Sequence, residues 1–259
     1  MASSTLRIAW RNLWRNGKRT LLAVLAIAVG QWALLATRGM MRGYADNIQN
    51  AITGPMLGHL QVHHPHYRDE RALELVLPQV TAKLSAIRAL SIVADAAPRI
   101  YAPVLCAPKQ DAFIATVVGI DLDSESKPQG LLTGYTAGLP PHQVLIGYRL
   151  ARTMKATVGQ EVAVVGQAID GSTANDLYTV AGIIEGPDDL VNQAGIVMRL
   201  TDAQELLAMQ DSAHEIVIRA RHAEDVPRLQ AELRMLPALV GLEVIEWREL
   251  MPEMVLVME

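Results

Sequence analysis

The first feature along the chain is a stretch without charge from Thr20 to Thr37, which is apolar on every side of a helix. At ~1.5 Å per residue a helix of this length spans ~27 Å, close to the hydrocarbon thickness of a bilayer. The pattern therefore predicts one transmembrane helix. Helical spacing continues through Tyr44, Ile48 and Ile52 and ends at Gly54-Pro55. We therefore expect a transmembrane helix and solvent-exposed stalk over residues 20–54.

The residues before this stretch have the pattern of an amphipathic helix. Leu6, Trp10 and Leu13 share one helical face, and basic residues line the other. An amphipathic helix with tryptophans and a basic stripe is typical of a membrane interface. We predict such a helix at the cytoplasmic interface over residues 1–19, with an elbow at Gly17.

The remaining two hundred residues mix period-2 and helical patterns, which predicts an α+β fold. Strands are expected at Gly58–His63, Arg99–Leu105, Ala112–Ile120, Val144–Ile146, Val158–Val165, Leu177–Ile184, Ile196–Met198, Glu215–Ala220 and Leu242–Glu246. Helices are expected at Leu77–Leu90, Tyr148–Met154, Asp202–Met209 and Asp225–Leu236. Val158–Val165 and Leu177–Ile184 read as a hairpin, and Thr201 with Gln204 as a capping box.

The order of these elements predicts the domain organisation. Glu215–Glu246 reads as a βαβ crossover with parallel neighbouring strands, and Gly58–Leu105 repeats the same order. We expect a split α+β lobe built from residues 55–120 and 210–246, with a β-rich lobe inserted at 121–209. Residues 247–259 turn helical and apolar, which predicts a return stalk helix leading to a second transmembrane helix absent from this sequence.

Charge divides the chain in two. No acidic residue precedes Asp46, whereas seven basic residues do; since the total is −4, the remainder carries −11. Five basic residues precede the apolar stretch and two follow it, so the positive-inside rule places the N-terminus in the cytoplasm and the bulk of the chain in the periplasm. The acidic remainder argues against a nucleic-acid partner.

Three other interpretations of the apolar stretch fit the sequence less well than a membrane anchor. A cleaved signal peptide has a shorter charged end and a small-residue cleavage site, which is not found after Leu35. A buried core helix is rarely flanked by five basic residues and no acidic ones. A mitochondrial transit peptide does not lead into 18 uncharged residues. A membrane anchor remains the prediction.

The sequence offers few candidates for a catalytic or metal-binding site. His59, His63, His64 and His66 cluster, and His59 and His63 share one side of a strand, but no carboxylate or thiol completes a metal set at a suitable spacing. The alternative, that these histidines bind nothing, stays open. No catalytic, cofactor-binding or metal residue is therefore assigned.

Other functional motifs do not occur, and the paired aspartates have a structural explanation. No nucleotide-binding, nucleophile-elbow or zinc-protease motif occurs, so any ATP hydrolysis belongs to a partner. The pairs Asp188-Asp189 and Asp121/Asp123 lie in expected turns, where aspartate is common for backbone reasons. The single cysteine, Cys106, excludes an intrachain disulfide.

Four segments resemble one family of permeases when they are taken in order: LRIAWRNLWRNGKRTLLAVLAIAVG, GPMLGHLQVHHPHY, VLIGYRLARTMKATVGQEVAVV and WRELMPEMVLVME. They are similar to the macrolide-exporter, lipoprotein-release and FtsX-like permeases of ABC transporters. The resemblance implies a MacB-type periplasmic domain, four membrane helices, a cytoplasmic ABC ATPase partner and a second permease copy or homologous permease. It also implies mechanotransmission, in which the stalks carry ATP-driven movement to the periplasmic domain.

This resemblance leads to a non-enzymatic permease subunit in a bacterial inner membrane, with lipoprotein, lipid-like or peptide cargo. An unbroken helix suits this role, because a flexible linker would dissipate displacement. Gly39 and Gly43 form a small-residue pair through which two stalks could approach. Two alternatives stay open: a single-pass periplasmic adaptor or binding protein without ATPase coupling, and a membrane-anchored enzyme.

Overall fold

The computed structural model describes residues 17–53, 57–109, 111–128, 130–132 and 134–252. The chain divides into two compact units, residues 1–48 and 49–259. Most of the predicted interface helix over residues 1–19 lies outside the described residues; residues 17–19 are the start of the first described helix.

Helix α2 (Gly17–Thr53) is a single unbroken helix of 37 residues, so the expected helix up to Gly54 is confirmed over its described length. Its part from Gly17 to Met41 is long and apolar enough to cross a membrane, judged by length and composition. Large side chains of this part are exposed, including Trp32 at 72 %. Apolar surface of this extent requires cover from lipid or from another protein.

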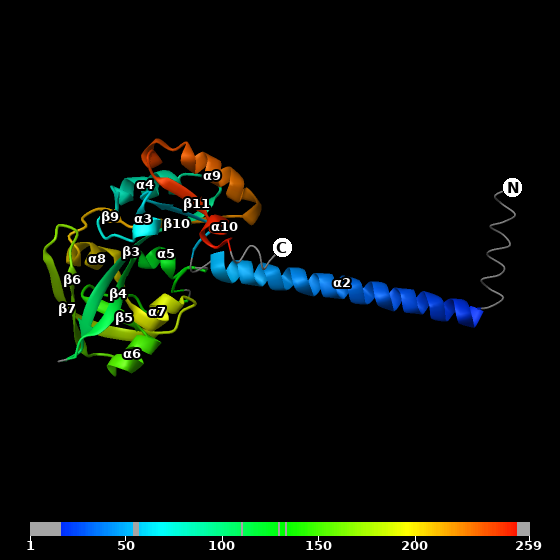
Figure 1. The fold of residues 1–259 in the computed structure, drawn as a ribbon, viewed down its shortest axis with the longest axis horizontal. Helices are drawn as coiled ribbons and strands as arrows, with labels where there is room; N and C mark the ends of the chain where they lie inside the picture. The colour runs from blue at the N-terminus through cyan, green and yellow to red at the C-terminus, as the bar shows by residue number, and fades with distance from the viewer. Residues whose placement is uncertain (1–16, 54–56, 110, 129, 133, 253–259) are drawn as a thin grey trace. The chain divides into compact units, whose positions relative to one another are not determined.

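The second unit begins with a four-stranded arrangement that we call the first lobe. Its strands β1 (Leu60–His63), β3 (Val93–Ala107), β10 (Glu215–Ala220) and β11 (Glu243–Glu246) lie in the order β11-β1-β10-β3. Every neighbouring pair is antiparallel. Helices α4 (Val80–Arg88) and α9 (Val226–Arg234) connect them (Figure 1).

This order corrects one expectation. Strands β10 and β11 are parallel, as a crossover requires, but β1 lies between them, so they are not neighbours. The same holds for β1 and β3, which are separated by β10. The first lobe is therefore a pair of interlocked split βαβ units. Local sequence spacing reveals the crossover but not the strand that is inserted into it.

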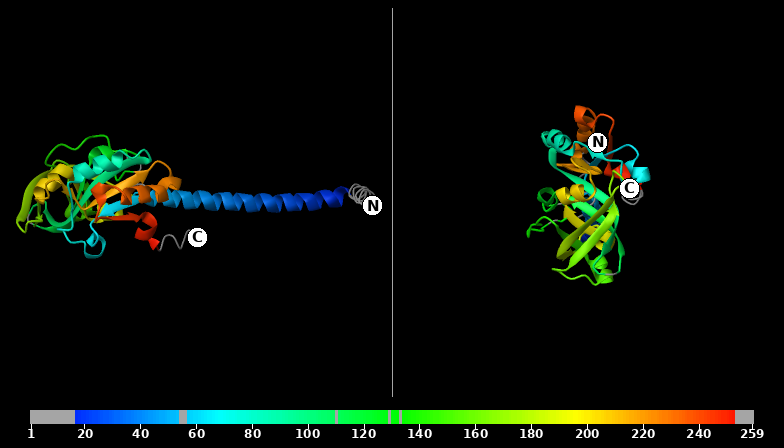
Figure 2. Two further views of the ribbon diagram at one scale, coloured as in Figure 1. Left: turned by 90° about the horizontal axis from the view of Figure 1, so that it is seen from above. Right: turned by 90° about the vertical axis from the view of Figure 1, so that its left-hand side faces the viewer.

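The sheet continues from β3 into a closed barrel. Its strands are β3, β4 (Phe113–Ile120), β8 (Gly195–Arg199), β5 (Gln143–Gly147), β7 (Thr173–Ile184) and β6 (Glu161–Gln167). Strand β6 pairs back with β3 from Val104 to Ala107, which closes the ring. In the right-hand view of Figure 2 the green and yellow-green strands of this barrel curve around one another. The sheet itself is thus continuous across the expected lobe boundary at residue 121.

Strand β3 is much longer than predicted because it serves both lobes. Its first half, from Val93 to Arg99, pairs with β10, and its second half pairs with β4 and β6. The expected hairpin of β6 and β7 is confirmed as an antiparallel pair. The parallel pair β5–β7 contains an irregularity between Val144 and Leu145.

Short elements complete the domain: α3 (Tyr67–Glu70), β2 (Leu77–Pro78), α5 (Leu122–Glu125), α6 (Tyr148–Met154), α7 (Asp189–Ala194), α8 (Leu200–Leu206), β9 (Ser212–Ala213), η1 (Ala223–Asp225), η2 (Pro237–Leu239) and α10 (Trp247–Leu250). Helix α6 has the predicted bounds. The helix expected from Leu77 begins only at Val80, because Leu77 pairs with Ala213.

The predicted capping box is wrong. Helix α8 follows β8 directly and begins at Leu200, with Arg199 at the N-cap. The Thr201 hydroxyl donates to the Asp202 carboxylate, and the Gln204 amide donates to the Ser212 carbonyl. Of the expected return helix over residues 247–259, α10 is described, and residues 253–259 lie outside the described part.

Candidate functional site

The sheet of the first lobe has one apolar and one polar face. On the apolar face Leu60, Ile216 and Ile218 belong to the same buried cluster as residues of α4 and α9. The opposite face carries polar residues of the other parity, most of them buried: His59, Gln61, His63, Asp95, Arg99, Tyr101, Glu215 and Arg219. Buried polar groups must find partners within the protein, so the side chains of this face are expected to be paired.

A buried ion cluster of Arg99, Glu125 and Arg219 occupies the middle of this face. The Arg99 Nε and Nη2 atoms donate to Oε1 and Oε2 of Glu125 at 2.6 and 3.1 Å. Arg219 Nη2 donates to Oε2 at 2.9 Å. All three side chains are essentially without solvent contact. Burial alone would raise the pKa of the Glu125 carboxyl, but Arg99 and Arg219 hold it below its usual value.

The cluster attaches the turn-rich segment after β4 to the sheet. Glu125 is the last residue of α5, and its Oε2 also accepts from the Leu131 backbone N–H at 2.7 Å. Gly130 approaches so closely that a Cβ atom there would lie 2.2 Å from the Glu125 carbonyl oxygen. A side chain larger than hydrogen has no room, so the residue identity at 130 follows from this docking.

A second contact holds the same segment to α4. Arg88 Nη2 donates to the Ala96 carbonyl, to Asp121 Oδ2 at 3.1 Å and to Ser124 Oγ at 3.0 Å. Asp121, which was expected to be a turn residue, therefore lies at the start of α5 in an ion pair. Helix α4, strand β3 and helix α5 are joined through one guanidinium group.

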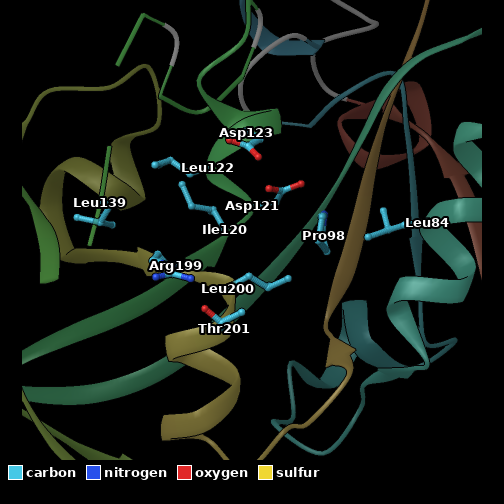
Figure 3. A pocket seen from close by; sticks show the side chains of 10 residues that line it. All are labelled: Leu84, Pro98, Ile120, Asp121, Leu122, Asp123, Leu139, Arg199, Leu200 and Thr201. Carbon is cyan, nitrogen blue, oxygen red and sulfur yellow. The ribbon is translucent and has the colours of Figure 1, made fainter. Parts of the chain in front are cut away.

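A cavity of about 360 Å³ lies beside this junction. Figure 3 shows Leu84 and Pro98 of the first lobe on one side and Leu139 on the other, with Asp121 and Asp123 above Arg199 and Thr201. Its walls thus come from both lobes. The charged groups lie on the barrel side, where Asp121 is already engaged with Arg88.

A larger cavity, of about 550 Å³, opens on the polar face. Its lining includes Gln61, Tyr101 and Glu215 from the sheet, and Tyr67 and Arg68 from α3. Glu215 is 5 % exposed, and its Oε1 accepts from the Tyr101 hydroxyl at 3.2 Å. Burial raises the pKa of the Glu215 carboxyl, although Arg99 and Arg71 oppose the shift. The cavity therefore combines a buried acid with aromatic walls.

The histidine cluster is divided between two environments. His59 and His63 are buried on β1 or beside it: His59 Nδ1 accepts from the Ala220 N–H at 3.1 Å, and His63 Nδ1 lies 3.5 Å from Glu243 Oε2. Burial lowers the pKa of both, for His63 to about 4. His64 and His66 lie on the turn that follows, where the His66 N–H donates to His64 Nδ1. Within the described part of the chain, no group of three or more His, Cys, Asp or Glu side chains could hold a metal ion.

Another histidine, which the sequence did not single out, is also buried. His214 Nδ1 accepts from the Tyr101 N–H at 3.0 Å, so its Nε2 carries the proton and donates to the Leu73 carbonyl. Its ring stacks on Tyr67 with centroids 5.1 Å apart. Burial lowers its pKa.

The remaining candidates have structural roles. Asp188 caps α7 by accepting from the Leu190 N–H at 2.8 Å, and Asp189 pairs with Arg149 on the surface. Cys106 is buried, and burial raises its pKa to about 11. None of these groups forms a nucleophile arrangement.

Sequence reasoning missed the residues that the structure brings together on the polar face. Glu125 lies in a segment without periodicity, and its partners are 26 and 94 positions away. A signal was available in the strand EIVIRA, where Glu215 and Arg219 share a parity. All six residues of this strand are buried, so its charges had to face one another or another buried group.

Comparison with known proteins decides the family. Residues 20–236 match the family described as the MacB-like periplasmic core domain. The chain belongs to this family. Such a domain is the periplasmic part of an ABC transporter permease, so the resemblance stated from the sequence and the α+β fold class are confirmed. No relative was found among curated proteins.

One solved structure agrees with the MacB-like fold, and two others are less similar. The periplasmic region of MacB from Actinobacillus actinomycetemcomitans superimposes with a TM-score of 0.53 at 10 % identity, covering 79 % of this chain and 95 % of that one. The extracellular domain of YknZ, a noncanonic ABC-type transporter from Gram-positive bacteria, gives 0.46 at 10 % identity, with 72 % and 98 % covered. A domain of a putative permease from Porphyromonas gingivalis gives 0.39 at 14 %, with 73 % and 89 % covered. At these identities the first match supports the fold alone.

Proposed function

We propose that this chain acts as the permease subunit of an ABC transporter complex, in which a separate cytoplasmic ATPase drives rearrangement of the MacB-like periplasmic domain. The observation that carries the proposal is helix α2. It runs without interruption from the apolar part that ends at Met41 to Thr53, and the family match begins within it at residue 20. A continuous helix of this kind can transmit displacement across a membrane interface.

The proposal assigns no catalysis to this chain. ATP binding and hydrolysis lie in the partner, because the sequence has no phosphate-binding loop. The N-terminus faces the cytoplasm and the MacB-like domain faces the periplasm of a bacterial inner membrane, as the distribution of basic residues around the span suggests. Lipoprotein, lipid-like or peptide cargo rests on family resemblance.

Coupling through α2 is tested with a substitution just beyond the apolar part. Gly43→Pro interrupts the helix by removing a backbone donor, whereas Gly43→Ala preserves it. A Cβ atom at Gly43 would meet no atom outside the helix's own backbone within 4 Å in the described chain, so the two variants differ in their effect on the helix itself. The complex is purified with its ATPase in nanodiscs, and ATP-driven release of cargo is measured for each variant.

We expect Gly43→Pro to uncouple ATP hydrolysis from cargo release while the complex with the ATPase still assembles. Gly43→Ala should behave as wild type. Equal release by both variants would exclude α2 as the transmitting element. Purification of the full chain without any P-loop ATPase, together with function in its absence, would instead support a single-pass adaptor or binding protein.

A further inference from the structure

The 550 Å³ cavity lies where several separate segments of the second unit meet. Its floor is the polar face of the first lobe, with Gln61, Tyr101 and Glu215. One wall is α3 and the residues after it. The remaining walls are the start of α7, at Asp188 and Leu190, and the end of α10, at Leu250 and Met251.

Part of the cavity wall is apolar. Leu190 is 46 % exposed although it lines the cavity, and Leu57, Leu250 and Met251 are partly exposed. Partly exposed apolar side chains that converge on a concave site beside polar groups are typical of small-molecule sites.

Four charged residues line the cavity, and they differ in depth and in engagement. Arg68 donates through Nη2 to the carbonyls of Glu249 and Leu250 at 2.9 and 3.3 Å. The Arg71 guanidinium is exposed and lies 5.3 Å from the centroid of the Tyr67 ring. Asp188 is half-buried and caps α7. Each of these three groups already has a structural role in the wall.

Glu215 differs from the other three because it is buried and belongs to the floor. Arg99, directly opposite on β3, gives its Nε and Nη2 donors to Glu125, and the Tyr101 hydroxyl donates to Glu215. Interactions with a buried charge are stronger than those with exposed charges of opposite sign, because the effective dielectric constant is lower. An ionised carboxylate has about four acceptor positions, so Glu215 can accept a further donor.

We propose that this cavity binds an organic amine with an apolar body, with its ammonium group at Glu215 and its body along Leu190, Leu250 and Met251. The Tyr101 hydroxyl already donates to the same carboxylate at 3.2 Å, so the ammonium group would be a second donor there. A charged donor at the carboxylate offsets the desolvation that otherwise disfavours ionised Glu215.

The site has a consequence for the end of the domain. Leu250 and Met251 belong to the cavity wall, and Arg68 holds the backbone carbonyls of Glu249 and Leu250. An occupant of the cavity therefore contacts the end of α10 and the residue after it. The inference does not depend on ATPase coupling, so a binding measurement on the full chain alone tests it separately from the proposed function.

The test uses two fluorescent probes that share a dansyl group and a five-methylene linker. Dansylcadaverine ends in an ammonium group, and dansyl-6-aminohexanoic acid ends in a carboxylate. Each is titrated into the full chain in nanodiscs and into empty nanodiscs, with fluorescence anisotropy as the readout. We expect saturable binding of the amine above the empty-disc signal, and no saturable binding of the acid.

Two variants locate the site. Glu215→Gln keeps the shape and the acceptor for Tyr101 but removes the charge, and it should weaken amine binding about tenfold. Glu224→Gln, at an exposed position in η1, is the matched control and should leave binding unchanged. Leu190→Ser removes an apolar wall without touching the buried acid and should also weaken binding.

Several results of these measurements would overturn the proposal. Equal binding of both probes, binding of the acid alone, no saturable binding, or unchanged affinity in a folded Glu215→Gln variant would each overturn the proposal. If circular dichroism shows that Glu215→Gln does not fold, the decision passes to Leu190→Ser. Unchanged amine binding by that variant would then reject the site.

Discussion

The first lobe and the barrel bury the faces of their strands in different ways. The barrel closes on itself, so its interior consists of apolar residues such as Val162, Val164, Val180 and Ile196, all without exposure. The first lobe is an open sheet. Helices α4 and α9 cover one face, and the other is a polar layer covered in part by α5 through the buried ion cluster.

The two lobes should therefore differ in how strongly their stability depends on pH. Apolar burial responds little to pH, whereas buried ion pairs and neutral histidines do. Outer strand positions of the barrel even expose apolar side chains, with Ile114 at 82 % and Leu177 at 58 %. Changes in protonation should therefore act first on the first lobe and on its attachment to α5.

The largest expected effect comes from the buried ion cluster. Glu125→Gln removes the carboxylate that both guanidinium groups share, and the loss of one partner from a buried ionic set costs about 3–5 kcal/mol. Urea denaturation of the full chain in detergent measures the change. Glu232→Gln, which breaks only the surface pair with Arg228, is the matched control and should cost at most about 1 kcal/mol. Similar losses for both variants would contradict the special role of the cluster.

Acidification should destabilise the first lobe. His59, His63 and His214 have folded pKa values below the 6.5 of an unperturbed histidine. The unfolded chain therefore binds more protons, and stability is lost as the pH falls from 6.5 towards about 4, the folded pKa of His63. Glu215, with its raised pKa, acts in the opposite direction.

The contribution of His63 is isolated by comparing denaturation of wild type and His63→Gln between pH 7 and pH 4. The wild type should lose about 1–3 kcal/mol more than the variant over this range. Parallel pH curves for the two proteins would show that His63 does not titrate in a buried, neutral state.

Close packing at Gly130 should give a smaller effect. Gly130→Ala places a Cβ against the Glu125 carbonyl, and relief of this contact must displace the docked segment, at a cost of about 1–3 kcal/mol. Gly186→Ala is the control, because its Cβ would lie 3.6 Å from the Leu131 carbonyl, an ordinary contact. Thermal denaturation of both variants should therefore separate them; identical midpoints would mean that the segment adapts freely.

The smallest expected effect belongs to the barrel. Ile196→Val removes one buried methyl group and should cost about 0.5–1.5 kcal/mol. Its loss should be the same at pH 7 and pH 5, since no ionisable group is involved. A marked pH dependence for this variant would break the contrast between the two lobes.

Much of the local structure could be predicted from the sequence. Helix α6 and the β6–β7 hairpin follow from short-range periodicity and turn residues, and the structure has them as expected. The strand expected from Arg99 begins at Val93 in the structure and passes through Pro98, because β3 pairs with β10 before it pairs with β4 and β6.

The polar face could not be predicted in the same way. Glu125 meets Arg99 and Arg219 only because β10 returns beside β3 after the whole barrel has been formed. Sequence spacing gives the faces of single strands, such as the shared side of His59 and His63, but not which distant strand lies opposite. The small-residue pair Gly39 and Gly43 stays a prediction for the same reason, since its partner would be a second chain.

The central claim is that a MacB-like domain on the far side of the membrane is moved through α2, and the location of that domain tests it most directly. Cys106 is buried, so a new cysteine at exposed Ser172 provides a specific reporter. In intact spheroplasts that express Ser172→Cys, a membrane-impermeant maleimide should label the chain fully before lysis. Labelling that appears only after lysis would place the domain in the cytosol and contradict the account.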